Sequence, residues 1–349
     1  MFILNRTPYK ISLIRGHISD TMAVAAVVAE VVYAIQADGR LLATREREEQ
    51  PSDPPSAAKY PIWAEVSLTV SGSIACPARP PYTRRLALRA GDRHLELLVH
   101  GDRRWRRGFS GSLEAGEPQP FDRMALGFER AFGGSFVQAP GPDPLSGLPH
   151  PGGKIAYPLN PEGIGFYGDE ISAENGLLAN IEWADRPVLV WDDRPEPAGF
   201  SPCPSLHGLR FPMESIMKLP LPKDPELAQK ALSSFPMTML ASLRMPHFAH
   251  KKLIFRESEL KPGTPIELRG MASGDIPIGF LVPPPPVDVF EADSRESDLK
   301  NSPALRPNLR NLHIDADGRY LLATYGYMTR YRPSFGPEWF HVNPLAAEV

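Results

Sequence analysis

Short stretches in which hydrophobic and polar residues alternate recur along the chain, separated by proline, glycine and Asp-Gly sequences. Residues 2–14 alternate weakly, with a bend at Thr7-Pro8, and residues 62–74 alternate clearly. Residues 84–99 predict two strands joined at Gly91-Asp92. Alternation with a period of two is typical of a β strand that has one buried face. The pattern therefore predicts many short strands.

Two Asp-Gly sequences predict β hairpins near the two ends of the chain. Asp38-Gly39 follows the Val- and Ala-rich residues 23–35, and these two residue types supply the positive φ angles of a two-residue hairpin turn. The second hairpin joins residues 309–314 and 320–327 through residues 316–319. Further short strands are predicted at 187–191, 253–255, 266–268 and 276–282.

Helices are predicted to be few and short. The best candidate spans residues 225–233, with Asp224 as the N-cap and Pro225 at the first helical position. The fold class expected is therefore all-β or β-dominated, sandwich-like or barrel-like, with one or two short helices.

Three parts are expected along the chain. Residues 1–286 form the main β-rich domain and end in four prolines that leave the sheet as an extended segment. Residues 287–308 are charged and rich in turn-forming residues, which predicts a linker or extended loop. Residues 309–349 contain the last hairpin, which is expected to pack back on the main domain.

Arginines, aromatic residues and glycines are concentrated between residues 99 and 166. Residues 124–132 alternate with a period of two, which predicts a strand with Arg130 on its apolar face. A buried guanidinium must be paired, so Arg130 is interpreted first as a clamp for loop carbonyls and second as an anion-binding group. Asn160, before Pro161, is expected to cap backbone amides in a tight loop.

Three sequences in this region resemble those of a bacterial domain-of-unknown-function family found beside type VI secretion genes. They are VHGDRRW at 99–105, FERAFGG at 128–134 and NPEGIGF at 160–166. LLANIEW at 177–183, PEPAGFSP at 195–202 and LKPGTPIELRG at 260–270 fit as well, whereas residues 61–76 and 206–211 depart from the pattern.

The resemblance implies a non-enzymatic adaptor or chaperone that binds a type VI secretion effector and helps to load it onto the spike. Its motif residues would shape the fold or the docking surface: Asp102, Arg103, Trp105, Arg130, Gly133, Gly134, Asn160, Gly163 and Gly165. It implies protein partners, namely the effector and a spike protein.

The composition excludes several function classes. A formal charge of −3 gives no general attraction to nucleic acid or to acidic lipid, so neither is expected as a partner. The longest apolar run, residues 22–35, is shorter than the roughly 20 residues of a membrane-spanning helix, and no leader is evident. Two cysteines, Cys76 and Cys203, suggest a reducing compartment, although one bridge between them stays open. We expect a cytoplasmic protein.

Isolated chemical motifs occur without the context that they need. GIGFYG at 163–168 matches a dinucleotide-binding pattern, but prolines interrupt the segment before it. The pairs His247/His250 and Cys203/His207 have no further ligand or oxyanion hole nearby. No catalytic residue, cofactor or metal is therefore expected.

Aromatic and basic residues favour contacts between proteins. Arg103, Arg104, Arg106 and Arg107 surround Trp105 and are expected to pair with acidic loops such as Asp169-Glu170, or with an acidic partner, rather than with nucleic acid. Trp63, Trp105, Phe109 and Tyr82 are candidate exposed aromatic residues at an interface.

Two other functions remain open at this point. In a hydrolase-like enzyme, Asp102, Glu129 and Glu182 would be the first candidate acids, and a pocket gathering two of them would favour this alternative. A structural subunit of the secretion apparatus is the other.

Overall fold

The computed structural model describes residues 1–19, 22–44, 65–143, 145, 147–202, 249–271, 277–332 and 336–345. The described part consists mainly of short strands and contains a single α-helix, α1 (Glu170–Ala173). No sheet in these ranges closes into a barrel. The β-dominated fold class is confirmed, and its sheets are open.

The largest sheet has seven strands in the order β19-β5-β23-β24-β3-β2, with β4 paired to β3. Its strands are β2 (Lys10–Ser19), β3 (Met22–Ile35), β4 (Leu41–Thr44), β5 (Glu65–Ser71), β19 (Ile254–Arg256), β23 (Asn308–Asp315) and β24 (Tyr320–Tyr331). Both predicted hairpins are therefore confirmed. In the first, Ile35 pairs with Leu41, so the turn spans five residues around Gly39 rather than two. Gly39 has a φ of +85°, which glycine adopts without strain.

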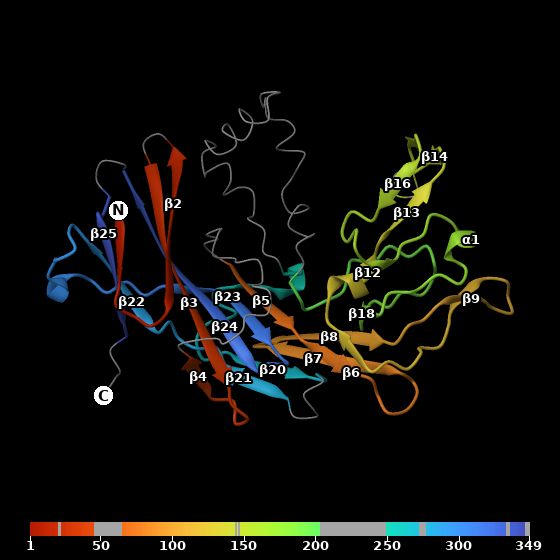
Figure 1. Ribbon diagram of the computed structural model, residues 1–349, viewed down its shortest axis with the longest axis horizontal. Helices are drawn as coiled ribbons and strands as arrows, with labels where there is room; N and C mark the ends of the chain where they lie inside the picture. The colour runs from red at the N-terminus through yellow and green to blue at the C-terminus, as the bar shows by residue number, and fades with distance from the viewer. Residues whose placement is uncertain are drawn as a thin grey trace.

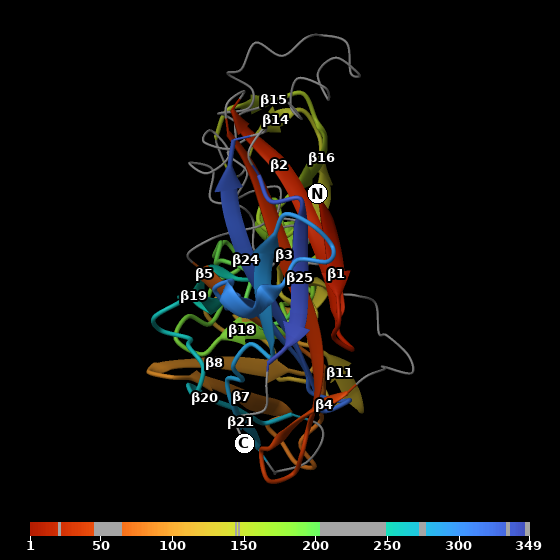
Figure 2. The same cartoon turned by 90° about the vertical axis from the view of Figure 1, so that its left-hand side faces the viewer.

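A second sheet of five strands packs across the first. Its order is β18-β8-β7-β20-β21, formed by Ile181–Trp183, Arg93–His100, Thr83–Ala90, Pro265–Arg269 and Ile278–Leu281. Strands β7 and β8 run across the direction of β2, β3 and β24 (Figure 2). The main core lies between these sheets and includes the fully buried Leu86, Leu97, Val70, Phe255 and Tyr325.

A small third sheet closes the end of the molecule at which the chain begins (Figure 1). β25 (Trp339–Pro344) lies between β1 (Phe2–Asn5) and β22 (Val287–Ala292). Residues 2–14 therefore form two strands in different sheets, not the single strand predicted. The segment 287–308, predicted as a linker, begins with the paired strand β22 and also holds a short 3-10 turn, Leu299–Asn301.

The middle of the chain forms a second, smaller core that projects from the main body (Figure 1). We call it the distal lobe: residues 103–194, apart from two strands that pair with the main body, β11 (Arg123–Ala125) and β18. β11 pairs with β6 (Ser73–Ala75). The lobe holds α1 and the strands β9 (Trp105–Arg107), β10 (Leu113–Ala115), β12 (Phe132–Gly133), β13 (Ser135–Gln138), β14 (Gly141–Pro142), β15 (Pro149–His150), β16 (Gly153–Ala156) and β17 (Ile164–Gly165).

Two predicted strands in this region are wrong. Residues 124–132 do not stay extended, because Phe128–Arg130 turns as a 3-10 helix between β11 and β12. Met124, Leu126 and Phe128 are buried with a period of two as predicted, but β11 ends at Ala125 and the 3-10 helix begins at Phe128. Residues 187–191 form a loop that exposes Leu189 and Val190. The predicted helix at 225–233 lies outside the described residues.

Candidate functional site

Two of the sequence motifs interlock inside the distal lobe. FERAFGG and NPEGIGF meet as the parallel pair β12–β17, with Phe132 opposite Ile164 and Gly133 opposite Gly165. A Cβ atom at Gly133 would collide with the carbonyl oxygen of Asn160, and one at Gly163 would lie 2.6 Å from the carbonyl oxygen of Ala131. Glycine is required here because the two backbones lie against each other.

Asn160 fastens this contact. It is 1% exposed, and its Nδ2 donates to the carbonyl oxygens of Phe128 (2.6 Å) and Phe132 (3.1 Å). The prediction that Asn160 caps backbone amides is therefore wrong, because its side-chain amide donates to backbone carbonyl oxygens instead. Asn160 thus holds the 3-10 turn to β12.

Two further motifs, VHGDRRW and LLANIEW, join the distal lobe to the five-stranded sheet through a buried ion pair. Arg103 Nη2 donates to Glu182 Oε1 (2.5 Å) and to the carbonyl oxygen of Ala179 (2.9 Å). His100 Nε2 lies 3.6 Å from Glu182 Oε2, and its Nδ1 is bonded to the Thr83 hydroxyl (2.8 Å). We call His100, Arg103 and Glu182 the junction cluster; each is less than 9% exposed.

Electrostatics keep Glu182 charged. Burial by itself raises the pKa of Glu182, but the neighbouring His100 ring and the Arg103 guanidinium outweigh it and hold the pKa below its ordinary value of 4.5. A general acid needs the opposite shift, toward neutral pH. Glu182 is therefore a structural anion in this arrangement.

The other candidate acids lie apart from it on the surface. Asp102 is exposed, and its Oδ1 accepts a hydrogen bond from Asn180 Nδ2 (3.0 Å). Glu129 is also exposed, on the 3-10 turn. The structure does not bring these carboxylates together with Glu182 in one pocket, so the observation that would favour the hydrolase alternative is missing among the described residues.

The buried arginine is Arg103, not Arg130 as predicted. Arg130 is half-buried, and no described residue accepts a hydrogen bond from its guanidinium. Its backbone carbonyl instead accepts from the Asn180 N–H (2.8 Å). A guanidinium is buried only where a carboxylate pairs with it, and Arg103 has that partner in Glu182.

The aromatic and basic residues of the β9–β10 hairpin are divided between core and surface. Trp105, predicted to be exposed, is 1% exposed in the distal core, whereas Phe109 at the hairpin tip is fully exposed. Arg107 pairs with Glu170 (3.0 Å) and Glu174 (2.8 Å) of the α1 region, so the expected pairing with an acidic loop is found. Tyr82 is half-buried, and Trp63 lies outside the described residues.

The remaining candidate ligand pairs form no site in the described chain. His250 is buried, where its Nδ1 accepts from the Lys252 N–H and its ring packs on Trp183. Its proposed partner His247, and both members of the Cys203/His207 pair, lie outside the described residues. The described part contains no group of three or more His, Cys, Asp or Glu side chains placed to hold a metal ion. None of its helices is long and apolar enough to cross a membrane.

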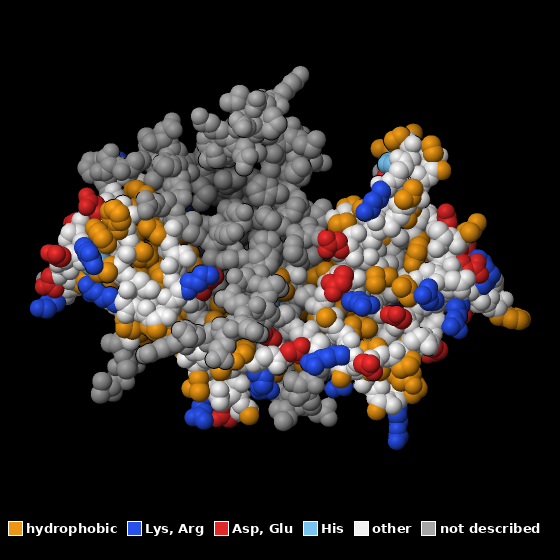
Figure 3. All heavy atoms as spheres, in the orientation of Figure 1, with side chains coloured by type: hydrophobic (Ala, Val, Ile, Leu, Met, Phe, Trp, Pro, Cys, Tyr) orange, Lys and Arg blue, Asp and Glu red, His pale blue; other side chains and the backbone are white. Residues whose placement is uncertain are grey.

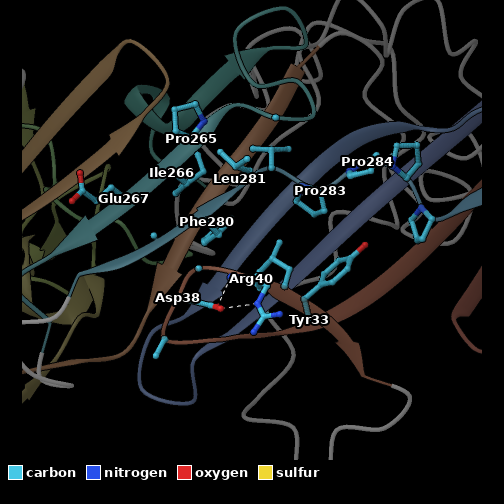
Figure 4. Close-up of a pocket in the computed structure, with 18 of the residues that line it drawn as sticks. Tyr33, Asp38, Arg40, Pro265, Ile266, Glu267, Phe280, Leu281, Pro283 and Pro284 are labelled. Atoms are coloured by element: carbon cyan, nitrogen blue, oxygen red, sulfur yellow. Dashed lines mark hydrogen bonds and ion pairs between the residues drawn. The ribbon is translucent and has the colours of Figure 1, made fainter. Parts of the chain in front are cut away.

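A large open groove, of about 1260 Å³, lies in the main body. It is away from the motifs of the distal lobe, but LKPGTPIELRG contributes Gly263, Pro265 and Ile266 to its lining. It forms where the Asp38-Gly39 turn, the end of β21 and the four prolines Pro283–Pro286 meet. In Figure 4, Leu281 and Pro265 line one side, and Tyr33, Asp38 and Arg40 of the β3–β4 hairpin line the other. We call it the proline groove, because seven of its lining residues are prolines.

The proline groove is apolar and its charges are already paired. Of the described lining residues only Asp38, Arg40 and Glu267 are charged. Arg40 Nε lies 2.6 Å from Asp38 Oδ2, and the backbone N–H and guanidinium of Arg40 hold the pKa of Asp38 below its ordinary value. Glu267 is bonded to Arg269 (2.7 Å). Burial raises the pKa of Tyr33 to about 12, so its hydroxyl stays protonated.

Sequence reasoning recognised the parts of the groove but not the groove itself. The sequence predicts the hairpin turn, the strand before residue 283 and the four prolines, yet the turn lies more than 200 residues before the other two. These segments come together because the two large sheets cross, and no local sequence pattern predicts that crossing. The close approach of Gly39 to the Gly279 carbonyl, 2.7 Å from an added Cβ, fixes this meeting.

Comparison with known proteins identifies the family. Residues 20–325 match the family described as "Uncharacterized protein conserved in bacteria (DUF2169)". No curated protein and no solved structure matches the chain. Because the match covers most of the chain, the protein belongs to this bacterial family.

Proposed function

We propose that this member of the DUF2169 family is a non-enzymatic adaptor or chaperone that binds a type VI secretion effector and helps to load it onto the spike complex. The resemblance of the motif sequences supports the secretion context. The observation that carries the binding role is the proline groove, which is open, apolar and free of unpaired charge in its described lining. Exposed apolar surface of this kind marks sites of protein contact.

The position of the motif residues also supports binding rather than catalysis. Arg103 Nη2 is bonded to Glu182 Oε1 at the junction with the main body, and Asn160 Nδ2 is bonded to backbone carbonyl oxygens inside the distal lobe. A rigid lobe serves an adaptor, since pre-organised surfaces lose less entropy on binding. We therefore assign to the motifs the task of presenting surfaces, not of reacting.

The distal lobe offers further apolar surface. Seven of the ten large hydrophobic residues that are exposed in the described chain belong to it: Phe109, Val137, Leu145, Leu148, Ile171, Leu189 and Val190. Figure 3 shows hydrophobic side chains gathered at its tip, over the β14–β15 hairpin. Contiguous exposed apolar patches mark sites of protein contact, so the tip of the lobe is a second candidate binding surface.

Co-expression with the products of neighbouring genes tests the proposal. The expected result is a stable complex with an effector or a spike protein in size-exclusion chromatography with light scattering. Elution of the chain alone beside every neighbouring product would contradict it, and rings or stacks of this chain alone would favour a structural subunit.

A further inference from the structure

We propose that the proline groove binds an uncharged, extended segment of the partner protein, seated along the outer edge of β21 and against the four prolines. This inference rests on the proposed binding function and adds the surface and the chemistry of the segment. Three independent features of the groove support it: its backbone edge, its lining and its charge.

The backbone edge is provided by the last strand of the five-stranded sheet. Val282 N–H donates to Thr264 O (2.9 Å), and Gly263 N–H donates to Val282 O (2.8 Å). Backbone groups alternate in direction along a strand, so those of Leu281 point away from β20 and toward the groove. In the described chain no strand pairs with this edge of β21. An extended segment can therefore pair with Leu281.

The neighbouring chain limits how far such pairing can extend. At one end the Asp38-Gly39 turn lies against the carbonyl group of Gly279. At the other, Pro283–Pro286 have no N–H groups, and the carbonyl oxygen of Pro283 already accepts from the Tyr325 hydroxyl (3.1 Å). Backbone pairing is thus confined to a short site at Leu281, and side-chain packing must supply most of the affinity.

The lining suits an extended apolar chain. Tyr9 lines the groove beside the proline rings, and the largely buried Tyr33 and Phe280 reach it with a small exposed part. Grooves lined by aromatic residues bind extended, proline-containing segments, which lose little entropy because they are stiff before binding. The volume of about 1260 Å³ also exceeds the roughly 300–1,000 Å³ of small-molecule pockets, which favours a chain segment over a small ligand.

The pairing of all charged residues in the described lining determines which partner segment the groove can bind. The Asp38–Arg40 and Glu267–Arg269 pairs leave the groove without a free countercharge among its described residues. A charged side chain entering the groove would lose its hydration and gain no ion pair, so it would weaken binding. The complementary segment is uncharged.

Two leucines provide matched variants for the test. Leu281 is 59% exposed and lines the groove, whereas Leu42 is 55% exposed on β4 and does not line it. Because both side chains are mostly in solvent, Leu281→Lys and Leu42→Lys should fold alike, and equal thermal midpoints would establish this. The probe is a ten-residue peptide of alternating proline and leucine with serine at each end, titrated by calorimetry into the full chain.

The expected result is saturable binding of the peptide, weakened about tenfold or more by Leu281→Lys and unchanged by Leu42→Lys. Replacing two leucines of the peptide by glutamate should weaken binding to a similar extent. No binding at about 1 mM peptide, equal affinity of both variants, or tighter binding of the glutamate peptide would overturn the inference. A dimer that Leu281→Lys dissociates would assign the groove to a second copy of this chain.

The peptide test addresses the groove and the co-expression test addresses the adaptor function, so one proposal can be contradicted while the other stands. A complex with an effector that survives Leu281→Lys would keep the adaptor function and remove the groove from it. Peptide binding without any effector complex would keep the groove as a binding site and remove the secretion role.

Discussion

At the residue scale, one buried ion pair explains why the motif sequences combine arginine with an acid far along the chain. Arg103 and Glu182 are 79 residues apart, yet both are almost fully buried and directly bonded. Two charges can be removed from water only if each satisfies the other, together with further polar groups such as the Ala179 carbonyl. The pair therefore specifies how the distal lobe sits on the sheet.

Removing one residue of the Arg103–Glu182 ion pair should strongly destabilise the folded protein. We expect Arg103→Ala to lower the free energy of unfolding by about 3–5 kcal/mol, because it leaves the Glu182 carboxylate buried without its countercharge. Arg130→Ala is the matched control, since its half-buried guanidinium bonds no described residue, and its effect should stay within about 0.5 kcal/mol. Urea unfolding monitored by tryptophan fluorescence measures both. Equal losses in the two variants would restore Arg130 as the clamp.

The same pair makes stability depend on pH. The pKa of Glu182 is lower in the folded protein than its ordinary value of 4.5, so the unfolded chain binds the proton more readily. The stabilisation is fully present above about pH 5 and should be lost as the pH falls through the folded-state pKa. Glu182→Gln should flatten this acid limb in thermal melts recorded from about pH 6 to about pH 3. An unchanged slope in the variant would show that other carboxylates cause the acid loss.

At the scale of elements, backbone contact between β12 and β17 explains the glycines of the two central motifs. Gly133 and Gly163 leave no room for a side chain, and Asn160 lies between their two segments. Close packing of two backbones is intolerant of added volume, because neither chain can move without breaking the 3-10 turn that Asn160 holds.

A single methyl group tests this packing. Gly163→Ala should destabilise the protein by about 1–3 kcal/mol or more, since the new Cβ would strike Asn160 and the Ala131 carbonyl. Gly141→Ala, in the same lobe, would place its Cβ 3.7 Å from its nearest neighbour and should be nearly neutral. Thermal unfolding of the two variants gives the comparison. A neutral Gly163→Ala would mean that the two segments can separate freely.

Local sequence patterns were sufficient for elements whose signals are themselves local. The Asp-Gly turns and the alternation in residues 84–99 identified hairpins that the structure contains. Local patterns failed where tertiary contacts determine the backbone conformation. Pro187–Trp191 has the composition of a strand but forms a loop, in which the Asp193 carboxylate accepts hydrogen bonds from the backbone N–H groups of Leu189 and Val190. Likewise Trp105 is buried by a lobe core that no single stretch reveals.

At the scale of the whole molecule, two kinds of surface are separated along an elongated body (Figure 1). The proline groove lies in the main body, and most exposed hydrophobic residues lie on the distal lobe. The buried junction cluster connects the distal lobe to the five-stranded sheet of the main body. An adaptor that joins an effector to a spike needs two such surfaces, which agrees with the proposed function.

Hydrogen exchange in the complex formed on co-expression tests the central claim, that the groove binds the partner while FERAFGG and NPEGIGF hold the fold of the distal lobe. On partner binding we expect slower exchange in residues 37–41 and 279–282, which border the groove. Exchange in residues 128–134 and 160–166 should be slow in the free protein and unchanged by the partner, because these segments are bonded within the lobe. Protection confined to the motif segments, with no change at the groove, would contradict the claim.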